Sequence, residues 1–372
     1  MFLKNDLMNT TENTQSRLLS LDFFRGFTMF LLIAEFTFLF DHLVSPQLKG
    51  SFVFFIGEQL HHHPWHGLRF WDLIQPFFMF IVGVAMPLSF SKRISKGDSY
   101  KSILKHIITR SLLLLLLGWG LYCIPDGIAF RFQNVLAQLS VTIIVAFLLI
   151  RKSPLTQISV SLGILIFTEI IYRVFWIEGF NQPFTPDHNF GAWFDMMISG
   201  ELASGHWVSF NAIPTSAHTI WGVLAGNLLM SNKTNKKKLY ILIVAGIVGL
   251  LIGYGLDPIT PIIKRISTTS FVFASAGWTF LALAASFWLI DMMKVQKGVK
   301  FFAVVGMNPL FIYLFAHVGG ADLLGQVIRP FSTALFGWTG ELGTLIITSL
   351  LVAFGLWYIC YWMYKRKLFI KI

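Results

Sequence analysis

The amino-acid sequence predicts an all-α, polytopic membrane protein with about ten transmembrane helices and both termini in the cytoplasm. Two observations support this fold class. Of the 372 residues, 55% are hydrophobic and only 13% are charged, and the apolar residues gather in long blocks. The basic residues cluster between these blocks. Because lipid offers the backbone no hydrogen-bond partners, the apolar blocks are expected to be helices.

Stretches of roughly twenty apolar residues, the length needed to cross the hydrocarbon core, define the expected spans. They cover residues 18–42, 71–91, 104–124, 134–150, 155–177, 208–231, 239–256, 268–292, 301–318 and 342–364. Residues 1–17 are mostly polar and are expected to form a short cytoplasmic tail. Residues 18–372 are expected to form a single transmembrane domain.

The distribution of Lys and Arg sets the expected orientation. The basic clusters occupy residues 92–101, 151–152, 233–238, 294–300 and 365–367. Cytoplasmic loops are enriched in Lys and Arg, so these clusters are placed inside and the histidine-rich loop is placed outside. Orientation also accounts for the net charge of +11 without a nucleic-acid partner, since no basic face or base-stacking module accompanies the charge.

The loop at residues 61–72 concentrates titratable side chains directly before the second span, with the sequence HHHPWHGLRFWD. An imidazole held at a membrane face can act as a base, and Asp72 can fix the tautomer of one ring. Asp72 can instead serve as the N-cap of the following helix. No metal site is expected, because three consecutive histidines cannot all point one way and no HExxH or spaced cysteine pattern accompanies them.

Ionisable residues inside the other spans are expected to face the bundle interior or the water boundary. Glu35 lies deep in the first span, whereas Arg25 lies near its start and can either pair with Asp22 or bind a ligand. Lys105 and Arg110 lie on the inner half of the third span. An arginine there can bind a phosphate bidentately or reach lipid headgroups.

Three asparagines within or beside the spans, Asn134, Asn211 and Asn308, need hydrogen-bond partners in the bundle. Each can join helices to one another or contribute to a ligand site. Asn308 differs from the other two because Pro309 follows it and interrupts the helix. Such breaks are tolerated where the backbone lines a cavity.

Three blocks early in the chain carry a resemblance to known proteins: LDFFRG at 21–26, WHGL at 65–68 and DLIQPFFMFIVG at 72–83. Weaker blocks follow in the same order at 134–139, 264–270 and 306–308. Together they resemble the heparan-α-glucosaminide N-acetyltransferase family and its bacterial relatives. Three positions depart from the family's pattern: Gln138 replaces an arginine, His317 is displaced by one place, and Glu35 or Phe36 stands where the family has an asparagine in the first span.

The resemblance implies a transmembrane acyltransferase of the bacterial inner membrane. Such an enzyme would transfer acetyl from cytosolic acetyl-CoA to the amino group of a glucosamine or glucosaminide on the periplasmic side. The family's catalytic histidine falls on His62. This side chain would act as a general base or carry the acetyl group itself, with Asp72 orienting it.

The remaining expected site residues bind the two substrates. Those expected to bind CoA are Arg110, Lys105, Arg25 and Asn308. Those expected to bind the amino sugar are Glu35, Trp65, Asn134, Asn211 and Lys264. The alternative is an amino-sugar permease, in which the same residues bind and do not react. Membrane lipids are the other expected partners, and a homodimer is one option for the oligomeric state.

Overall fold

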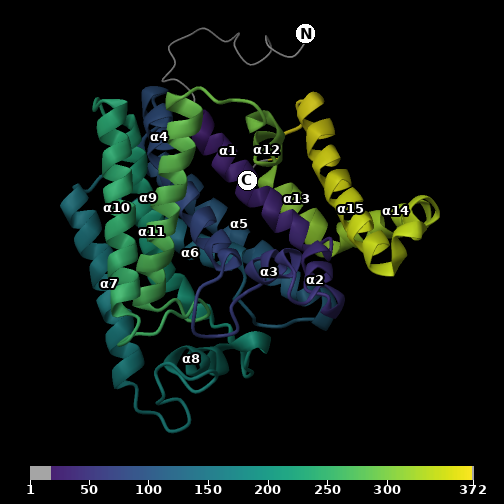
Figure 1. The fold of residues 1–372 in the computed structure, drawn as a ribbon. Coiled ribbons are helices and arrows are strands. Elements are labelled where there is room, and N and C mark those ends of the chain that lie inside the picture. Colours follow the sequence, from purple (N-terminus) through teal and green to yellow (C-terminus); the bar gives the residue numbers. More distant parts are fainter. Residues whose placement is uncertain (1–17, 371–372) are drawn as a thin grey trace.

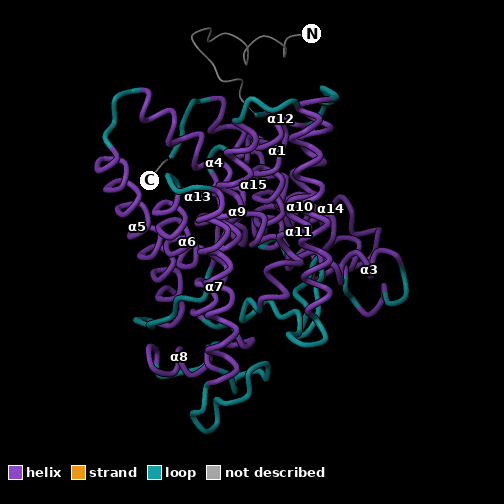
Figure 2. Tube along the Cα trace, turned by 90° about the vertical axis from the view of Figure 1, so that its left-hand side faces the viewer, coloured by secondary structure: helices purple, strands orange, loops and turns teal. Residues whose placement is uncertain are grey.

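The computed structural model describes residues 18–370, and the expected tail at residues 1–17 lies outside the described residues. The described part of the chain is helical and contains no strand (Figure 1). Most of the long helices run side by side, and the connecting loops gather at the two ends of the bundle (Figure 2).

The long helices follow the expected spans closely. They are α1 (Leu19–Glu35), α4 (Ile74–Ser95), α5 (Tyr100–Asp126), α6 (Val135–Leu149), α7 (Pro154–Val174), α9 (Ala212–Met230), α10 (Asn235–Leu256), α11 (Thr269–Ser286) and α15 (Gly340–Lys365). The shorter helices are α2 (Leu39–Leu43), α3 (Phe52–Gln59), α8 (Phe190–Ser199), α12 (Val299–Val305), α13 (Pro309–Phe315) and α14 (Ala321–Phe336).

Six helical stretches within residues 18–370 are long and apolar enough to cross a membrane. The all-α polytopic membrane class is therefore confirmed. The helices α1 and α6 are somewhat shorter, with 17 and 15 residues, and α12 and α13 are separated by the break before Pro309. The number of spans and the side on which the termini lie stay predictions.

Helix α14 was not expected from the sequence. Residues 319–341 carry Asp322, Arg329 and Pro330, which interrupt the apolar run and suggest a loop. The structure instead forms an amphipathic helix with Leu323, Val327, Phe331 and Leu335 exposed along one face. It packs against α15 at one side of the bundle (Figure 1).

Glycines bring α4 and α9 into close contact in the bundle core. A Cβ added to Gly83 would clash with the backbone oxygen of Thr219, and one added to Gly222 would clash with that of Phe80. Small residues allow such close helix packing in membranes. The contact fixes α4, whose first turn follows the histidine-rich loop.

Two loops meet at the end of the bundle that we call the histidine end. The loop at residues 60–73 lies against the loop at residues 257–268, because Gly67 N donates to Ile262 O at 2.9 Å and His66 forms a bridge with Ile263. His66 Nε2 also lies 2.8 Å from Asp257 Oδ1. The opposite end, which carries Arg93 and the Lys-rich start of α10, is called the basic end. The loop pairing places residue 264 beside residue 62.

Candidate active site

Asp72 holds the imidazole of His62 at the histidine end. The Asp72 side chain is 1% exposed, and its Oδ1 lies 2.9 Å from His62 Nδ1. Its Oδ2 accepts hydrogen bonds from the backbone N–H groups of Arg69 at 2.9 Å and His63 at 3.1 Å. Asp72 thus caps the helical turn and orients an imidazole at the same time. Asp72 is the third residue of this short turn, whose N-cap is Arg69, and the N-cap of α4 is Leu73. The interpretation of Asp72 as the N-cap of the following helix is therefore wrong.

Lys264 is the third member of this cluster. It is 6% exposed, and its Nζ lies 3.1 Å from His62 Nδ1 and 3.8 Å from Asp72 Oδ1. Burial lowers the pKa of Lys264 to about 8, against the opposing effect of the Asp72 and Glu35 charges. Burial and the Lys264 charge lower the pKa of His62 to about 4. The imidazole is therefore neutral at pH 7.

Trp207 covers the cluster from the segment between α8 and α9. Its ring lies 5.2 Å from the His62 ring in an edge-on arrangement, and Lys264 Nζ lies 5.5 Å from the Trp207 ring centre. A cation over an indole face is stabilised by the quadrupole of the ring. Sequence reasoning did not assign Trp207 to the site.

His62 lines a cavity of about 400 Å³, which we call the histidine cavity. The other polar or aromatic residues that line it are Glu35, Phe36, Trp71, Gln75, Phe78, Tyr122, Gln133, Asn134, Gln138, Trp207, Lys264, Tyr313 and His317. Glu35 Oε1 accepts a hydrogen bond from Trp71 Nε1 at 3.1 Å. Glu35, Asn134 and Lys264 were expected to bind substrate, and the structure brings all three to the same cavity as His62.

Asn134 and Asn211, which were both expected to bind the sugar, are engaged in other contacts. Asn134 lines the cavity, but its side chain caps α6 and donates to Gly118 O at 2.6 Å. Asn211 is fully buried between Gln138 Nε2, at 2.7 Å, and Arg265 O, at 3.1 Å. It is absent from the lining residues. Asn211 therefore joins structural elements, which is the helix-joining role considered for it from the sequence.

Trp65 also lies away from the histidine cavity. Its Nε1 donates to Phe184 O at 2.7 Å, and its ring packs edge-on against His206 at 5.9 Å. These contacts attach the histidine-rich loop to Phe184, before α8, and to His206, after it. Trp65 is therefore not among the residues that line the histidine cavity.

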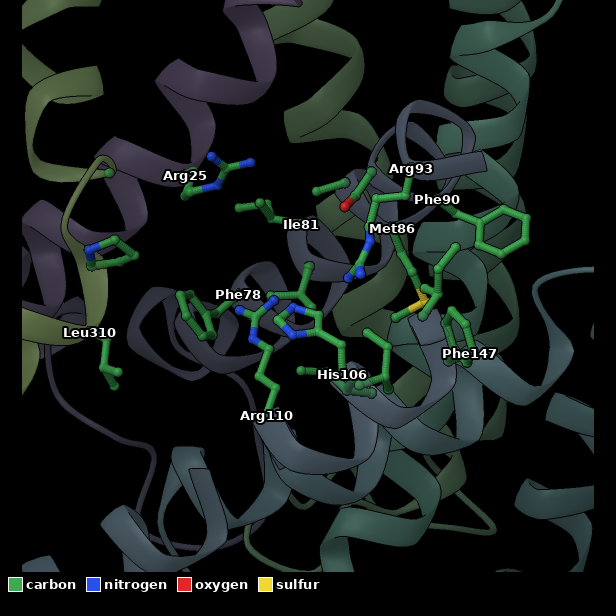
Figure 3. A pocket seen from close by; sticks show the side chains of 18 of the residues that line it. Arg25, Phe78, Ile81, Met86, Phe90, Arg93, His106, Arg110, Phe147 and Leu310 are labelled. Carbon is green, nitrogen blue, oxygen red and sulfur yellow. The ribbon is translucent and has the colours of Figure 1, made fainter. Parts of the chain in front are cut away.

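A second cavity of about 500 Å³, the basic cavity, opens nearer the basic end (Figure 3). Its charged or titratable lining residues are Arg25, Arg93, His106 and Arg110. Among the described residues that line it there is no aspartate or glutamate. Arg110 Nε is buried and has no hydrogen-bond partner within residues 18–370. This arrangement suits a ligand with several negative charges.

Only some of the residues expected to bind CoA line the basic cavity. Arg25 and Arg110 line the basic cavity, and Arg25 also lies 3.7 Å from Asp22. Lys105 is exposed on α5 and does not line it. Arg93 and His106, which were not assigned to the site, do line it. His106 precedes Arg110 by four residues, and this helical spacing places both on one face of α5.

Asn308 shapes the wall of the basic cavity without facing it. The side chain is fully buried, donates from Nδ2 to Leu368 O at 2.9 Å and accepts at Oδ1 from Ile370 N at 2.9 Å. Ile370 lines the cavity, as do Met307 and Pro309. The expected contact between Asn308 and CoA is replaced here by a contact with the segment that follows α15.

A narrow third cavity of about 60 Å³ lies between the other two. Residues that it shares with the basic cavity include Arg110, Pro309 and Leu310. Residues that it shares with the histidine cavity include Leu32, Val135 and Tyr313. Phe78 lines all three. The cavities therefore form a row from one end of the bundle toward the other.

Fold and site together define a polytopic helical membrane protein in which a buried His–Asp–Lys cluster adjoins a row of cavities leading to a basic pocket. A family model described as "Domain of unknown function (DUF5009)" matches residues 17–126. These residues include His62, Asp72, Arg25 and Arg110.

The chain is also similar to proteins named heparan-alpha-glucosaminide N-acetyltransferase. The mouse protein is 25% identical over 430 residues, which cover 98% of this chain and 62% of the relative. The human protein is 25% identical over 424 residues, which cover 96% of this chain and 60% of the relative. The chain thus spans about three fifths of the length of these relatives. At this identity the similarity supports the family and no particular substrate.

Proposed function

We propose that this chain is a transmembrane N-acetyltransferase. It binds acetyl-CoA in the basic cavity and transfers the acetyl group to the amine of an amino sugar in the histidine cavity. The row of three cavities joining the arginines to His62 is the observation that carries this proposal. The names of the similar mouse and human proteins support the same class of reaction. No observation favours the alternative of an amino-sugar permease.

The basic cavity suits the nucleotide part of CoA. Guanidinium groups bind phosphates through paired, charge-assisted hydrogen bonds. Arg25, Arg93 and Arg110 surround the cavity, and the unpartnered Nε of Arg110 would gain an acceptor there. The small third cavity is too narrow for a nucleotide but suits a thin chain such as the pantetheine arm. The thioester would then reach the histidine cavity while the phosphates stay among the arginines.

His62 supplies the proton chemistry. A neutral amine attacks the thioester carbonyl, the C–S bond breaks, and the nitrogen, which carries a positive charge after attack, loses its proton to an imidazole nitrogen. The thiolate takes up this proton and leaves as CoA. That ammonium-like proton is acidic, so a neutral imidazole of low pKa is a sufficient acceptor. In the alternative route, an imidazole nitrogen attacks the thioester first, the C–S bond breaks and CoA leaves. The amine then attacks the acetyl-imidazole, the bond from the acetyl group to the ring nitrogen breaks, and the imidazole is regenerated.

The proposed orientation follows the basic loops. With the basic end in the cytoplasm, acetyl-CoA enters from the cytosol and the amino sugar binds on the periplasmic side of a bacterial inner membrane. Glu35 lines the histidine cavity and offers a carboxylate to an amine or hydroxyl of the sugar. Residues 18–370 would act as one acyltransferase domain.

The decisive experiment measures transfer from labelled acetyl-CoA to glucosamine and short glucosaminides by purified protein in lipid. The expected result is transfer by the wild type and loss of transfer in His62→Ala, with CoA binding retained. His61→Ala is the matched control, because His61 is adjacent but pairs with Asp41 at 3.2 Å, away from the cavity lining. A wild type that binds CoA but acetylates no amino sugar would overturn the proposal.

A further inference from the structure

One nitrogen of His62 has two competing partners. His62 Nδ1 lies 2.9 Å from Asp72 Oδ1 and 3.1 Å from Lys264 Nζ. In a neutral imidazole one nitrogen carries the proton and the other offers a lone pair. Nδ1 can therefore donate to the Asp72 carboxylate or accept from the Lys264 ammonium, but it cannot do both at once.

The two arrangements leave the other ring nitrogen in opposite states. When Nδ1–H donates to Asp72, Nε2 has a free lone pair and can take a proton or attack a carbonyl. When Nδ1 accepts from the Lys264 ammonium, Nε2 carries the proton and can do neither. A neutral Lys264 amine is compatible with the first arrangement, because its own lone pair can accept from Nδ1–H.

The surroundings hold both partners in place. The Asp72 oxygen remote from Lys264 is bound by two backbone N–H groups, and Lys264 is held by the loop that pairs with the histidine-rich loop. The charges that act on Lys264 are those of Asp72, Glu35 and Arg265. His62 meets the same Asp72 and Arg265 charges, and Arg69 donates to its backbone oxygen at 3.4 Å.

We propose that Lys264 is a positioning residue that selects the tautomer of His62. Its ammonium form places the proton on Nε2, and its neutral form lets Nδ1 donate to Asp72 and frees the Nε2 lone pair. The catalytic consequence of a free Nε2 rests on the proposed function, whereas the tautomer selection itself does not. The charge on a side chain 202 residues away in sequence would thus decide whether the imidazole can react.

Both forms of Lys264 are accessible near neutral pH, because burial lowers its pKa to about 8. Below that pH the ammonium dominates, and the Nε2–H tautomer is expected. Above it the neutral amine dominates, and the Nδ1–H tautomer is expected. His62 itself stays neutral over this range, since its pKa is lowered to about 4.

Nitrogen NMR of histidine-labelled protein in lipid, without substrate, tests the selection directly. The His62 signals are assigned by their loss in His62→Gln. In the wild type the protonated nitrogen should change from Nε2 at pH 6.5 to Nδ1 at pH 9. In Lys264→Met it should be Nδ1 at both values, and in Lys264→Arg it should be Nε2 at both. One unchanging tautomer in all three proteins would overturn the proposal, and that result is independent of any acetyl transfer.

A second test uses the rate of acetyl transfer and compares Lys264→Met with the wild type on the same acceptor, so that titration of the acceptor amine cancels. The rate of Lys264→Met divided by the rate of the wild type should rise as the pH falls below about 8, approaching a tenfold increase per pH unit. Above about pH 8 this ratio should be constant. Lys264→Arg should be slow throughout. A purely structural role predicts the reverse, with loss in Lys264→Met at every pH and rescue by Lys264→Arg.

Discussion

The histidine cavity and the basic cavity differ in how their polar groups are partnered. Beside the histidine cavity, Asp72 and Lys264 are both within hydrogen-bond distance of His62, and Glu35 is bound by Trp71. In the basic cavity the described lining residues include no carboxylate. Arg93 and Arg25 pair with Asp98 and Asp22, which do not line the cavity, whereas Arg110 Nε has no hydrogen-bond partner within residues 18–370. The first region is organised by its own side chains for proton chemistry. The second is organised for a ligand that brings the negative charge.

The largest expected effect comes from removing the charge that orients His62. Asp72→Asn should lower the rate of transfer by roughly a thousandfold or more, because a buried amide cannot hold the productive tautomer as a carboxylate does. The measurement is the single-turnover rate at saturating acetyl-CoA. Asp41→Asn, which alters the exposed His61–Asp41 pair, is the control and should stay within about twofold, since exposed pairs contribute little. Equal losses in both variants would contradict the special role of the buried pair.

The next effect concerns the basic cavity alone. Arg110→Gln should weaken CoA binding by about 10- to 100-fold, since it removes a charge-assisted hydrogen bond, while the tautomer of His62 stays unchanged. Binding is measured by calorimetry with detergent-solubilised protein. Lys105→Gln on the same helix is the matched control, because Lys105 is exposed and does not line the cavity. A larger loss in Lys105→Gln would show that the nucleotide lies elsewhere.

A smaller effect is expected at the junction of the two regions. Phe78→Trp adds volume where the three cavities meet, and should lower the rate of transfer by roughly tenfold, with CoA binding nearly unchanged. Phe90→Trp enlarges a side chain that lines only the basic cavity and should leave transfer nearly unaffected at saturating CoA. If both variants transfer acetyl at the wild-type rate, the pantetheine arm of CoA does not pass Phe78.

The parts of the fold that could be predicted from sequence are those set by local physics. Long apolar runs specify the spans, and the separation of only ten positions between His62 and Asp72 lets an imidazole and a carboxylate meet within one loop. The spacing of four residues between His106 and Arg110 also predicts that both side chains lie on one face of a helix. A separation of four residues rotates by about 40° around the helix, whereas the five residues from Lys105 to Arg110 rotate by about 140°. His106 accordingly lines the basic cavity with Arg110, whereas Lys105 does not.

The rest depends on contacts between distant segments. Lys264 reaches His62 only because the loop at residues 257–268 pairs with the histidine-rich loop, and no local pattern encodes that pairing. Trp207 arrives from a third segment. Asn308 was expected to bind CoA because its hydrogen-bond partners lie about sixty positions later in the sequence, where no local pattern connects them to it. Helix α14 was missed because its charged and proline residues suggested a loop, although its apolar face follows helical spacing.

The narrow third cavity also bears on membrane permeability. A protein that lets a substrate arm reach across a bilayer has to preserve the electrochemical gradient over the same bilayer. The cavity is lined almost entirely by apolar side chains, so it offers few partners for a chain of water molecules, and the Arg110 charge at its border repels protons and other cations. The same few side chains would therefore both block proton flow and let the substrate arm through. A variant that widens the third cavity for larger substrates is expected to leak protons across the membrane.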